Sequence, residues 1–234
     1  MKGVILAGGL GTRLFPLTKI TNKHLLPVYN KPMIYYPINT LISSGIKEIL
    51  VITGTESSGD FMKLLGSGKD FDCNFTFRIQ DGSHGIADAL RLAESFAENK
   101  NIAVVLGDNI FAEDFSEDVR KFDSGAQIFL KEIPDPERFG VAEFKNGKVL
   151  SIEEKPQNPK TNLAVTGIYF YDSSVFEKIR NTKLSSRNEY EITDVNNLYI
   201  AEEKMRGRVL HGSWSDAGTF ESLFCASEIA RNAL

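Results

Sequence analysis

Three short, almost uninterrupted apolar runs constrain the fold of this chain more than any other feature of its sequence. They occupy residues 3–7, 48–53 and 102–106 and are rich in Val, Ile and Leu. Strands that lack the alternation of polar and apolar residues are typical of a sheet that is covered on both faces. The runs therefore predict a largely parallel sheet with helices packed on its two sides.

Helical periodicity follows the first and precedes the last of these runs. Residues 32–45 predict a helix, because a proline stands early in the segment and a glycine closes it. Residues 86–97 predict a second helix, with apolar side chains recurring on one face. The alternation of strand and helix is typical of βαβ units.

The second half of the chain is richer in strands. These are expected at residues 126–133, 140–144, 149–153 and 164–171. The pair Asn146-Gly147 indicates a hairpin, and helices are expected again at 191–204 and 218–234. We therefore predict an α/β fold with a doubly wound, mostly parallel, Rossmann-like sheet and an antiparallel excursion, formed as a single domain over residues 1–234.

Charge, cysteine content and hydropathy exclude several classes of protein. The net charge is −4 and the basic residues are scattered, so no nucleic-acid partner is expected. Cys73 and Cys225 are too far apart in sequence for a zinc motif or a disulfide framework, which indicates a reducing cytoplasm. No apolar stretch approaches the roughly 18 residues of a membrane span, so no membrane partner is expected either.

A glycine-rich segment directly follows the first predicted strand. It contains Gly8, Gly9 and Gly11, then Thr12 and Arg13, and Lys23 stands a short distance beyond. Glycines at such a turn let backbone N–H groups approach phosphate oxygens, and nearby cations strengthen the binding. A turn with solvated basic residues is the alternative.

Two familiar phosphate motifs do not match this segment. A dinucleotide fingerprint that starts at Gly9 requires glycine where Leu14 stands, and the Gly-Lys-Ser/Thr ending of a P-loop is missing. The segment therefore predicts a phosphate-binding loop of another type.

The whole pattern from Gly8 to Lys31, GGLGTRLFPLTKITNKHLLPVYNK, resembles the opening signature of the sugar-1-phosphate nucleotidyltransferases. Within that family it is most similar to the glucose-1-phosphate thymidylyltransferases, because further blocks follow in the same order. These blocks are VLGDN at 105–109, DPERFGV at 135–141, EEKP at 153–156, AVTGIY at 164–169, EITD at 191–194 and WSDAGT at 214–219.

The resemblance implies a fold of the nucleotide-diphospho-sugar transferase type and a Mg²⁺-dependent enzyme. Its partners would be dTTP, or UTP, and a hexose 1-phosphate. The leading interpretation is transfer of a nucleoside monophosphate from dTTP to α-D-glucose 1-phosphate, which yields dTDP-glucose for polysaccharide synthesis and releases pyrophosphate. The sugar phosphate would attack the α-phosphorus in line, so no enzyme nucleophile is needed.

Both substrates are polyanions that repel each other until cations neutralise them, so positioning and electrostatic stabilisation dominate the chemistry. Arg13 and Lys23 would bind the triphosphate and Lys155 the sugar phosphate. By the resemblance, Asp108 and Asp216 match the family's metal-binding aspartates, and Mg²⁺ prefers one or two carboxylates completed by phosphate oxygens and water. Taken singly, Asp108 could be a turn residue and Asp216 a helix N-cap.

The resemblance also assigns residues to the two substrates. Within residues 78–86, a segment that resembles the family's nucleobase loop, Gln80 and Gly85 match the positions that bind the base, alongside Gly8, Gly9, Gly11 and Thr12 at the phosphates. Glutamine pairs with the N3–H and O4 groups that thymine and uracil share, so it does not separate the two bases. On the sugar side the matching residues are Asp108, Gly140, Glu154, Lys155, Val165, Tyr169 and Arg187.

Some residues depart from the family pattern. His24 stands where glutamine is usual, residues 81–84 differ in the nucleobase loop, and Asn188 replaces a glycine beside Arg187. His24 is expected to be a polar loop residue, and a solvated arginine is the alternative for Arg187. These changes bear on substrate preference more than on nucleotidyl transfer.

The sequence leaves alternatives for the substrates and for catalysis, and it also bears on the assembly state. A UTP-dependent enzyme, or one for another hexose 1-phosphate, is the nearest alternative, and a non-catalytic nucleotide-sugar sensor is a remote one. A Rossmann oxidoreductase conflicts with the glycine spacing. The chain resembles the short form of the family, so the familiar tetramer and feedback inhibition do not carry over, although a homo-oligomer is expected.

Overall fold

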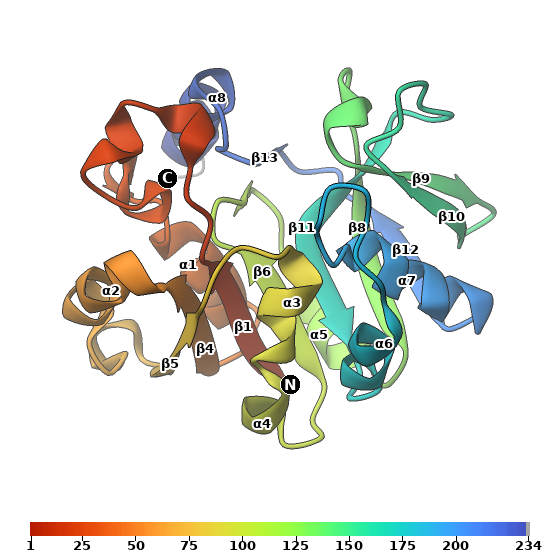
Figure 1. Ribbon diagram of the computed structural model, residues 1–234, viewed down its shortest axis with the longest axis horizontal. Helices are drawn as coiled ribbons and strands as arrows, with labels where there is room; N and C mark the ends of the chain where they lie inside the picture. The colour runs from red at the N-terminus through yellow and green to blue at the C-terminus, as the bar shows by residue number, and fades with distance from the viewer. Residues whose placement is uncertain (233–234) are drawn as a thin grey trace.

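The computed structural model describes residues 1–232 and is built on a nine-stranded sheet (Figure 1). Four neighbouring strands from the first half of the chain are parallel to one another. In spatial order they are β5 (Asn74–Gln80), β4 (Glu48–Gly54), β1 (Lys2–Ala7) and β6 (Ile102–Leu106).

The apolar runs form these strands because both faces of the sheet are covered. In β1, Val4 and Leu6 pack into the core on one face, whereas Ile5 and Ala7 pack into the core on the other. Because successive side chains of a strand point to opposite faces, a strand buried on both sides must be apolar at every position. The predicted strands at 3–7, 48–53 and 102–106 are confirmed.

The rest of the sheet contains the predicted antiparallel excursion. Strand β11 (Leu163–Tyr171) pairs antiparallel with both β6 and β8 (Ala126–Glu132), and β12 (Met205–Val209) is parallel to β8. Strands β9 (Gly140–Lys145) and β10 (Lys148–Glu154) form the edge of the sheet as the predicted hairpin.

The turn of that hairpin contains Asn146 and Gly147, both with positive φ, of 52° and 78°. These are the conformations that two-residue hairpin turns require and that Asn-Gly readily adopts.

Strands β10 and β11 run opposite to the other strands of the nine-stranded sheet. The sheet is therefore mixed, with most of its strands pointing in one direction.

Helices cover the two faces of the sheet, as Figure 1 shows. One face packs against α3 (Ile86–Arg91), α4 (Glu94–Ala97), α6 (Val175–Asn181) and α7 (Ile192–Ala201). The other packs against α1 (Tyr35–Ser43), α2 (Ser58–Leu65) and α5 (Ser116–Lys121).

A third apolar cluster lies under the last helix, α8 (Phe220–Asn232), and contains Val28, Met33 and Ile110. Two short strand pairs border it, β2 (Pro27–Val28) with β3 (Lys31–Pro32) and β7 (Ile110–Phe111) with β13 (Trp214–Ser215). Beneath α8, the segment that follows the glycine-rich loop therefore meets the end of the chain.

Three helix predictions had wrong limits. The helix expected at 32–45 begins at Tyr35, because Lys31 and Pro32 pair with the chain at 27–28. The helix expected at 86–97 is interrupted between α3 and α4, and the one expected at 191–204 ends at Ala201, before β12. The last helix is confirmed as α8, and its final two predicted residues, 233 and 234, lie outside the described range.

None of the helices within residues 1–232 is long and apolar enough to cross a membrane. Both Cys73 and Cys225 are free thiols, the first buried and the second exposed.

Candidate active site

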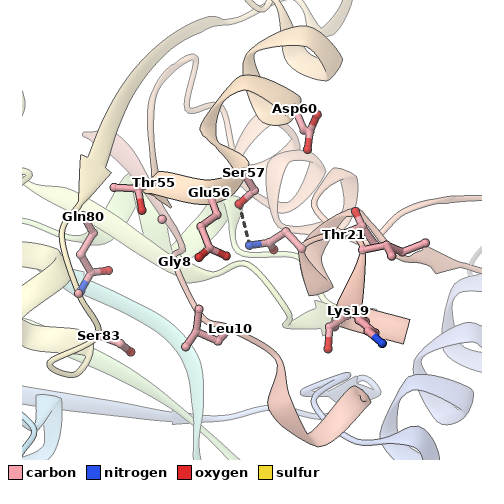
Figure 2. Close-up of a pocket in the computed structure, with 15 residues that line it drawn as sticks. Gly8, Leu10, Lys19, Thr21, Thr55, Glu56, Ser57, Asp60, Gln80 and Ser83 are labelled. Atoms are coloured by element: carbon pink, nitrogen blue, oxygen red, sulfur yellow. Dashed lines mark hydrogen bonds between the residues drawn. The ribbon is translucent and has the colours of Figure 1, made fainter. Parts of the chain in front are cut away.

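Two cavities open side by side at the carboxyl ends of the central strands, where ligands bind in sheets of this kind. The larger cavity, of about 440 Å³, is lined by residues 18–22 and 54–57 together with Gly8 and Gln80 (Figure 2). The smaller cavity, of about 200 Å³, contains most of the other predicted site residues. These are Arg13, Asp108, Gly140, Glu154, Lys155, Val165, Tyr169, Arg187 and Asp216.

Gly8 and Gln80 meet in the larger cavity. A Cβ atom on Gly8 would lie only 2.6 Å from Gln80 Oε1, so any side chain at position 8 would displace the glutamine. Gln80 is the last residue of β5, is largely buried, and makes no side-chain hydrogen bond to residues 1–232. Its amide is therefore free to bind a ligand. Residues 78–80 belong to the strand, so the loop expected there begins only at residue 81.

The glycine-rich loop is wrapped around the side chain of Lys23. Gly11 has φ of 65°, and a Cβ there would lie 2.8 Å from Lys23 Cβ and 2.9 Å from Thr18 Cγ2. Thr18 fastens the loop by donating its hydroxyl hydrogen to the Gly11 carbonyl oxygen at 2.8 Å. Gly9 also lies against Lys23, and Thr12 begins a short 3₁₀ helix, residues Thr12–Leu14, that carries Arg13.

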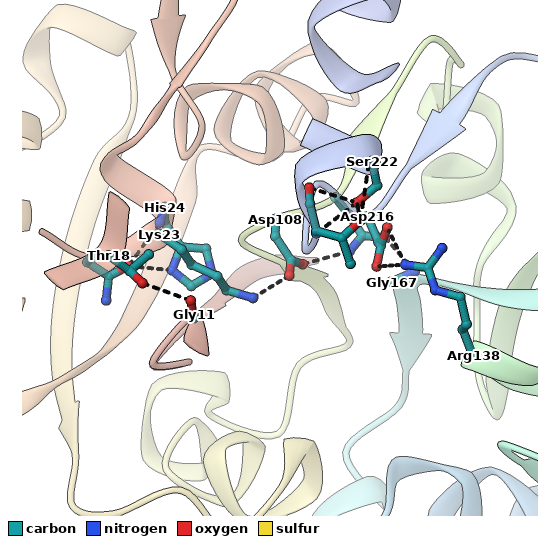
Figure 3. A network of polar contacts seen from close by, with 12 residues as sticks. Gly11, Thr18, Lys23, His24, Asp108, Arg138, Gly167, Asp216 and Ser222 are labelled. Carbon is teal, nitrogen blue, oxygen red and sulfur yellow. Dashed lines mark hydrogen bonds and ion pairs between the residues drawn. The ribbon is translucent and has the colours of Figure 1, made fainter. Parts of the chain in front are cut away.

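The ammonium group of Lys23 forms a short ion pair with the carboxylate of Asp108, which directly follows β6 (Figure 3). Both side chains are about nine-tenths buried, with 13% of each exposed. Burial acts to raise the pKa of Asp108, but the charge of Lys23, together with smaller contributions that include the hydrogen bonds from Lys23 and Asn109, outweighs burial and holds this pKa below its usual value. Asp108 is thus a buried carboxylate that stays ionised.

Asn109 fixes the orientation of that carboxylate. Its Nδ2 donates to Asp108 Oδ1 at 2.9 Å, and its Oδ1 accepts from the Gly167 N–H at 2.9 Å and from Trp214 Nε1 at 2.7 Å. The Asn109 side chain therefore links the end of β6 to β11 and to β13. A Cβ on Gly167 would lie 2.5 Å from the Asn109 side chain, and the register of β11 shifts at this point.

Asp216 is held on the other side of the smaller cavity. Its Oδ2 accepts from Arg138 Nη2 at 3.1 Å, and Arg138 also binds Asp135 at 2.8 Å. The Cβ position of Gly218 lies 3.0 Å from Arg13 Nη2 and 3.2 Å from Asp216 Oδ2, so Arg13 and Asp216 meet there. The first turn of α8 is bonded through Thr219 and Ser222 instead, and Asp216 makes no capping bond to it.

The two aspartates suit a divalent cation that also binds a ligand. Asp108 and Asp216 line the same cavity, and each carboxylate is balanced by a cation, Lys23 or Arg138. Residues 1–232 contain no cluster of three or more His, Cys, Asp or Glu that could hold a metal alone. Two carboxylates completed by phosphate oxygens and water form the ligand set that Mg²⁺ prefers.

Glu154 and Lys155 lie at the end of β10 on the far wall of the smaller cavity. Glu154 Oε2 accepts from Thr193 Oγ1 at 2.5 Å and Oε1 accepts from Arg187 Nη2 at 3.2 Å. Gly140 leaves room for this arrangement, because a Cβ there would lie 3.2 Å from Thr193 Oγ1. Lys155 is about half exposed, and its Nζ lies 3.9 Å from Glu154 Oε1.

Arg187 differs from the solvated loop arginine that was the alternative for it. Its guanidinium contacts three carboxylates, those of Glu154, Glu189 and Glu191, at 3.2, 3.3 and 2.7 Å. Burial acts to lower the pKa of Arg187, but these carboxylates raise it above its usual value. The guanidinium therefore organises the acidic wall of the cavity.

The expectation that His24 is a polar loop residue is wrong, because its side chain is almost fully buried. Its Nδ1 lies 2.7 Å from Asn22 Oδ1, and a Cβ on Gly107 would lie 2.7 Å from its Cδ2 atom. Burial and the neighbouring charge of Lys23 lower its pKa to about 3, so the ring is neutral. His24 packs beneath the site and does not line the larger cavity.

Gly85 lies at the N-terminus of α3, outside the lining of either cavity. Its φ is 97°, and a Cβ would lie 2.6 Å from the Tyr190 carbonyl oxygen. His84 accepts a hydrogen bond at its carbonyl oxygen from Tyr190 N at 2.8 Å. The loop expected to bind the base is thus fastened to the loop before α7.

Several polar residues that line the smaller cavity were not predicted as site residues, among them Asn109, Arg138, Thr193 and Asn196. The first three stand inside recognised sequence blocks, and Asn196 stands two residues beyond the block at 191–194. Their polar character and their closeness in sequence to predicted site residues were the signals that could have identified them. Their partners, however, come from distant strands and could not be inferred.

Comparison with known proteins agrees with this geometry. The sequence profile of the family described as "Nucleotidyl transferase" matches residues 2–232. The chain belongs to the nucleotidyl transferase family. The fold and the family resemblance inferred from the motifs are therefore confirmed.

Individual relatives of this nucleotidyl transferase carry more specific names. The glucose-1-phosphate thymidylyltransferase of Neisseria meningitidis is 45% identical over 99% of this chain and 83% of that protein. The enzyme of the same name from Mycolicibacterium smegmatis is also 45% identical, over 99% of this chain and 82% of its own length.

Among solved structures, a Bacillus anthracis protein named "Putative Glucose-1-Phosphate Thymidylyltransferase", in complex with a sucrose, is 50% identical. It superposes with a TM-score of 0.95 and covers 99% of this chain and 96% of its own. A UDP-glucose pyrophosphorylase complexed with UDP-glucose is 24% identical, with a TM-score of 0.85, and shares the fold.

The close contact at Gly167 predicts that Gly167→Ala displaces Asn109 and loosens Asp108. We expect a loss of about 1–3 kcal/mol in the free energy of unfolding, as for overpacking in a core, measured by urea denaturation. Gly59→Ala is the matched control, because Gly59 lies in α2 with nothing within 4 Å of its Cβ position. Equal effects of the two substitutions would contradict the proposed contact.

The buried neutral His24 predicts a pH dependence of stability. Its pKa is about 3 in the folded protein but near 6.5 when unfolded, so only the unfolded chain takes up this proton between those values. The contribution of neutral His24 to the free energy of unfolding is complete above pH 6.5. It is lost as the pH falls below that value, by up to about 1.4 kcal/mol per pH unit. His24→Gln should flatten the change in unfolding free energy between pH 7.5 and 5.5, and an unchanged slope would refute the assignment.

Proposed function

We propose that the chain transfers a nucleoside monophosphate from dTTP to α-D-glucose 1-phosphate, giving dTDP-glucose and pyrophosphate. The observation that carries this proposal is the buried pair of Lys23, enclosed by the glycine-rich loop that borders the larger cavity, with Asp108 of the smaller cavity. The names of the relatives at 45% identity support the choice of substrates.

The larger cavity suits the nucleotide. The free amide of Gln80 offers both a donor and an acceptor to the edge of a pyrimidine base. The glycine-rich loop from Gly8 to Gly11 leads from there to Lys23 and Arg13, which are the cations for the triphosphate. Because Gln80 pairs equally well with thymine and uracil, UTP is the second candidate nucleotide.

The smaller cavity suits the hexose 1-phosphate. Glu154 is held by Thr193 and Arg187 so that its carboxylate can accept hydrogen bonds from sugar hydroxyls. Lys155 adjoins it at the half-exposed rim, where its ammonium group can meet the phosphate. Arg187, which is already paired with three glutamates, would act on the sugar phosphate mainly by ordering this wall.

The reaction joins the two substrates without an enzyme nucleophile. An oxygen of the sugar phosphate forms a new bond to the α-phosphorus, and the bond from that phosphorus to the bridging oxygen breaks. Pyrophosphate leaves with the electron pair, and Lys23 and Arg13 stabilise its charge. Asp108 and Asp216 would hold Mg²⁺, which would neutralise phosphate charge when bound.

Two further features belong to the proposal. Residues 1–234 would act as one nucleotidyltransferase domain, since the predicted site residues lie on the nine-stranded sheet or on segments that connect its strands, and Asp216 follows β13 of a two-stranded pair beside it. A homo-oligomer stays a prediction, which sedimentation of the purified protein would check.

Pyrophosphate release with Mg²⁺ tests the function. Each of dTTP, UTP, ATP, CTP and GTP would be combined with glucose, galactose and mannose 1-phosphate. We expect the highest kcat/KM for dTTP with glucose 1-phosphate. A preference for UTP would support the second candidate, and no release with any pair would refute nucleotidyl transfer and favour a sensor.

Asp108→Asn should reduce kcat by at least about 10²-fold, because it removes a charge from the proposed metal site and the partner of Lys23. Steady-state kinetics and a thermal unfolding curve would be recorded together. The control is Asp70→Asn, at an exposed position remote from both cavities, and should leave the rate unchanged. A folded Asp108→Asn protein with full activity would contradict the metal assignment.

Lys155→Ala should raise the KM for glucose 1-phosphate by about tenfold or more, the effect of losing one charged hydrogen bond. The KM for dTTP should change much less. Lys145→Ala, at the exposed end of β9, is the matched control. Equal increases in both KM values would show that Lys155 does not belong to the sugar phosphate.

A further inference from the structure

The lining of the smaller cavity contains a buried polar side chain that the proposed mechanism does not use. Asn196 of α7 lines the cavity and is 1% exposed. Its Oδ1 accepts a hydrogen bond of 2.6 Å from the hydroxyl of Tyr171, which is itself fully buried. This is the one side-chain hydrogen bond that Asn196 makes to residues 1–232.

The bond from Tyr171 fixes which end of the amide is free. With Oδ1 occupied by the phenol, the Nδ2 group has no partner among the described residues. This unpaired Nδ2 atom is not completely shielded from solvent, since Arg208 Nε is the one side-chain atom among the described residues that is both fully shielded and unpaired. Because Asn196 lines the cavity, its Nδ2 atom reaches solvent there. A buried amide donor without a partner costs free energy until something binds it.

A second buried polar group in the same cavity also lacks a hydrogen-bond partner among the described residues. Tyr169 is 4% exposed, and its hydroxyl makes no hydrogen bond to the described part of the chain. Its ring lies 6.0 Å from that of Tyr171, with 9° between the planes, and Tyr171 stacks in turn on Tyr199. The stack holds Tyr169 and Tyr171 rigidly beside Asn196.

Burial in this stack also keeps the Tyr169 hydroxyl protonated, since desolvation raises its pKa well above the ordinary value. The cavity therefore offers a neutral hydroxyl from Tyr169 and an amide N–H from Asn196, together with the fixed carboxylate of Glu154. Such a mixture of donors and acceptors matches a ligand with several hydroxyl groups better than a planar base or a further anion.

We propose that Asn196 is a sugar-recognition residue whose side-chain amide binds one hydroxyl group of the hexose, and that Tyr171 is the positioning residue that sets its orientation. This inference rests on the proposed function and extends it, because it assigns part of the choice among hexose phosphates to α7. A hexose that lacks that hydroxyl leaves the amide unpaired and binds less tightly, as expected for sites that hydrogen-bond their substrate.

Two variants separate the amide from its support. Tyr171→Phe removes only the phenol hydroxyl, so the amide stays in the cavity but loses the bond that sets its orientation, and the KM of this variant for glucose 1-phosphate should lie between those of the wild type and the double variant. Tyr171→Phe combined with Asn196→Leu removes the amide as well, without leaving the phenol unsatisfied. Comparing these two proteins isolates the contribution of Asn196, and thermal unfolding would confirm that both are folded.

The KM and kcat would be measured for glucose 1-phosphate and for its 2-, 3-, 4- and 6-deoxy analogues, with dTTP saturating. For glucose 1-phosphate, we expect the double variant to have a KM about tenfold higher than that of Tyr171→Phe, the effect of about 1.4 kcal/mol. For one deoxy analogue the two variants should have the same KM, because that analogue lacks the hydroxyl which the amide binds. The KM for dTTP should be the same in both.

A loss of equal size for every analogue would overturn the inference, because it would show that Asn196 only supports the packing of α7. No loss for any analogue would overturn it too. Calorimetric titration with glucose, galactose and mannose 1-phosphate gives a readout that does not need turnover. A wild-type protein that binds one of these sugars without turnover would refute the proposed catalysis alone, whereas equal dissociation constants for the two variants would refute the role of Asn196.

Discussion

The ion pair between Lys23 and Asp108 is the interaction on which the rest of the site depends. Removing two charges from water costs several kcal/mol per ion, so such a pair is stable only when its remaining hydrogen-bonding groups are satisfied. Asn109 satisfies Asp108 and is held in turn by Gly167 and Trp214. Breaking any one of these contacts would leave a buried charge or amide unpaired.

The fold explains why these groups meet. Strands β1 and β6 are parallel neighbours, so the glycine-rich loop after Ala7 and the Asp108-Asn109 pair after Leu106 emerge at the same edge of the sheet. The antiparallel strand β11 crosses this edge, and its register shift at Gly167 gives Asn109 a backbone partner. The junction of parallel and antiparallel strands thus lies in the wall of the smaller cavity, which β6 and β11 line together.

Much of the fold could be predicted because burial on both faces leaves a clear signature. Strands β1, β4 and β6 are apolar at nearly every position, and Asn146-Gly147 specifies its turn locally. Strand β5 gave no such signal, since it forms an edge of the sheet and alternates polar residues with phenylalanines. Strand β12 was also missed, because its arginines pack over the rings of Phe122, Phe115 and Phe129.

The site could be predicted as a set of residues but not as a set of contacts. The motifs named Arg13, Asp108 and Asp216 as candidates, and the structure brings these three residues to one cavity. The burial of His24 depends on the missing side chain of Gly107, and Arg187 depends on Glu154, a residue 33 positions away. Such pairings are decided by tertiary packing, which no local pattern in the sequence encodes.

The stereochemical course of the reaction tests the central claim, direct transfer between the two adjoining cavities, most directly. One diastereomer of dTTP α-phosphorothioate would be converted with glucose 1-phosphate, and the configuration at phosphorus of the product would be determined by ³¹P NMR. A single in-line displacement predicts inversion. Retention would contradict it, because it requires two displacements and hence a nucleotidylated enzyme.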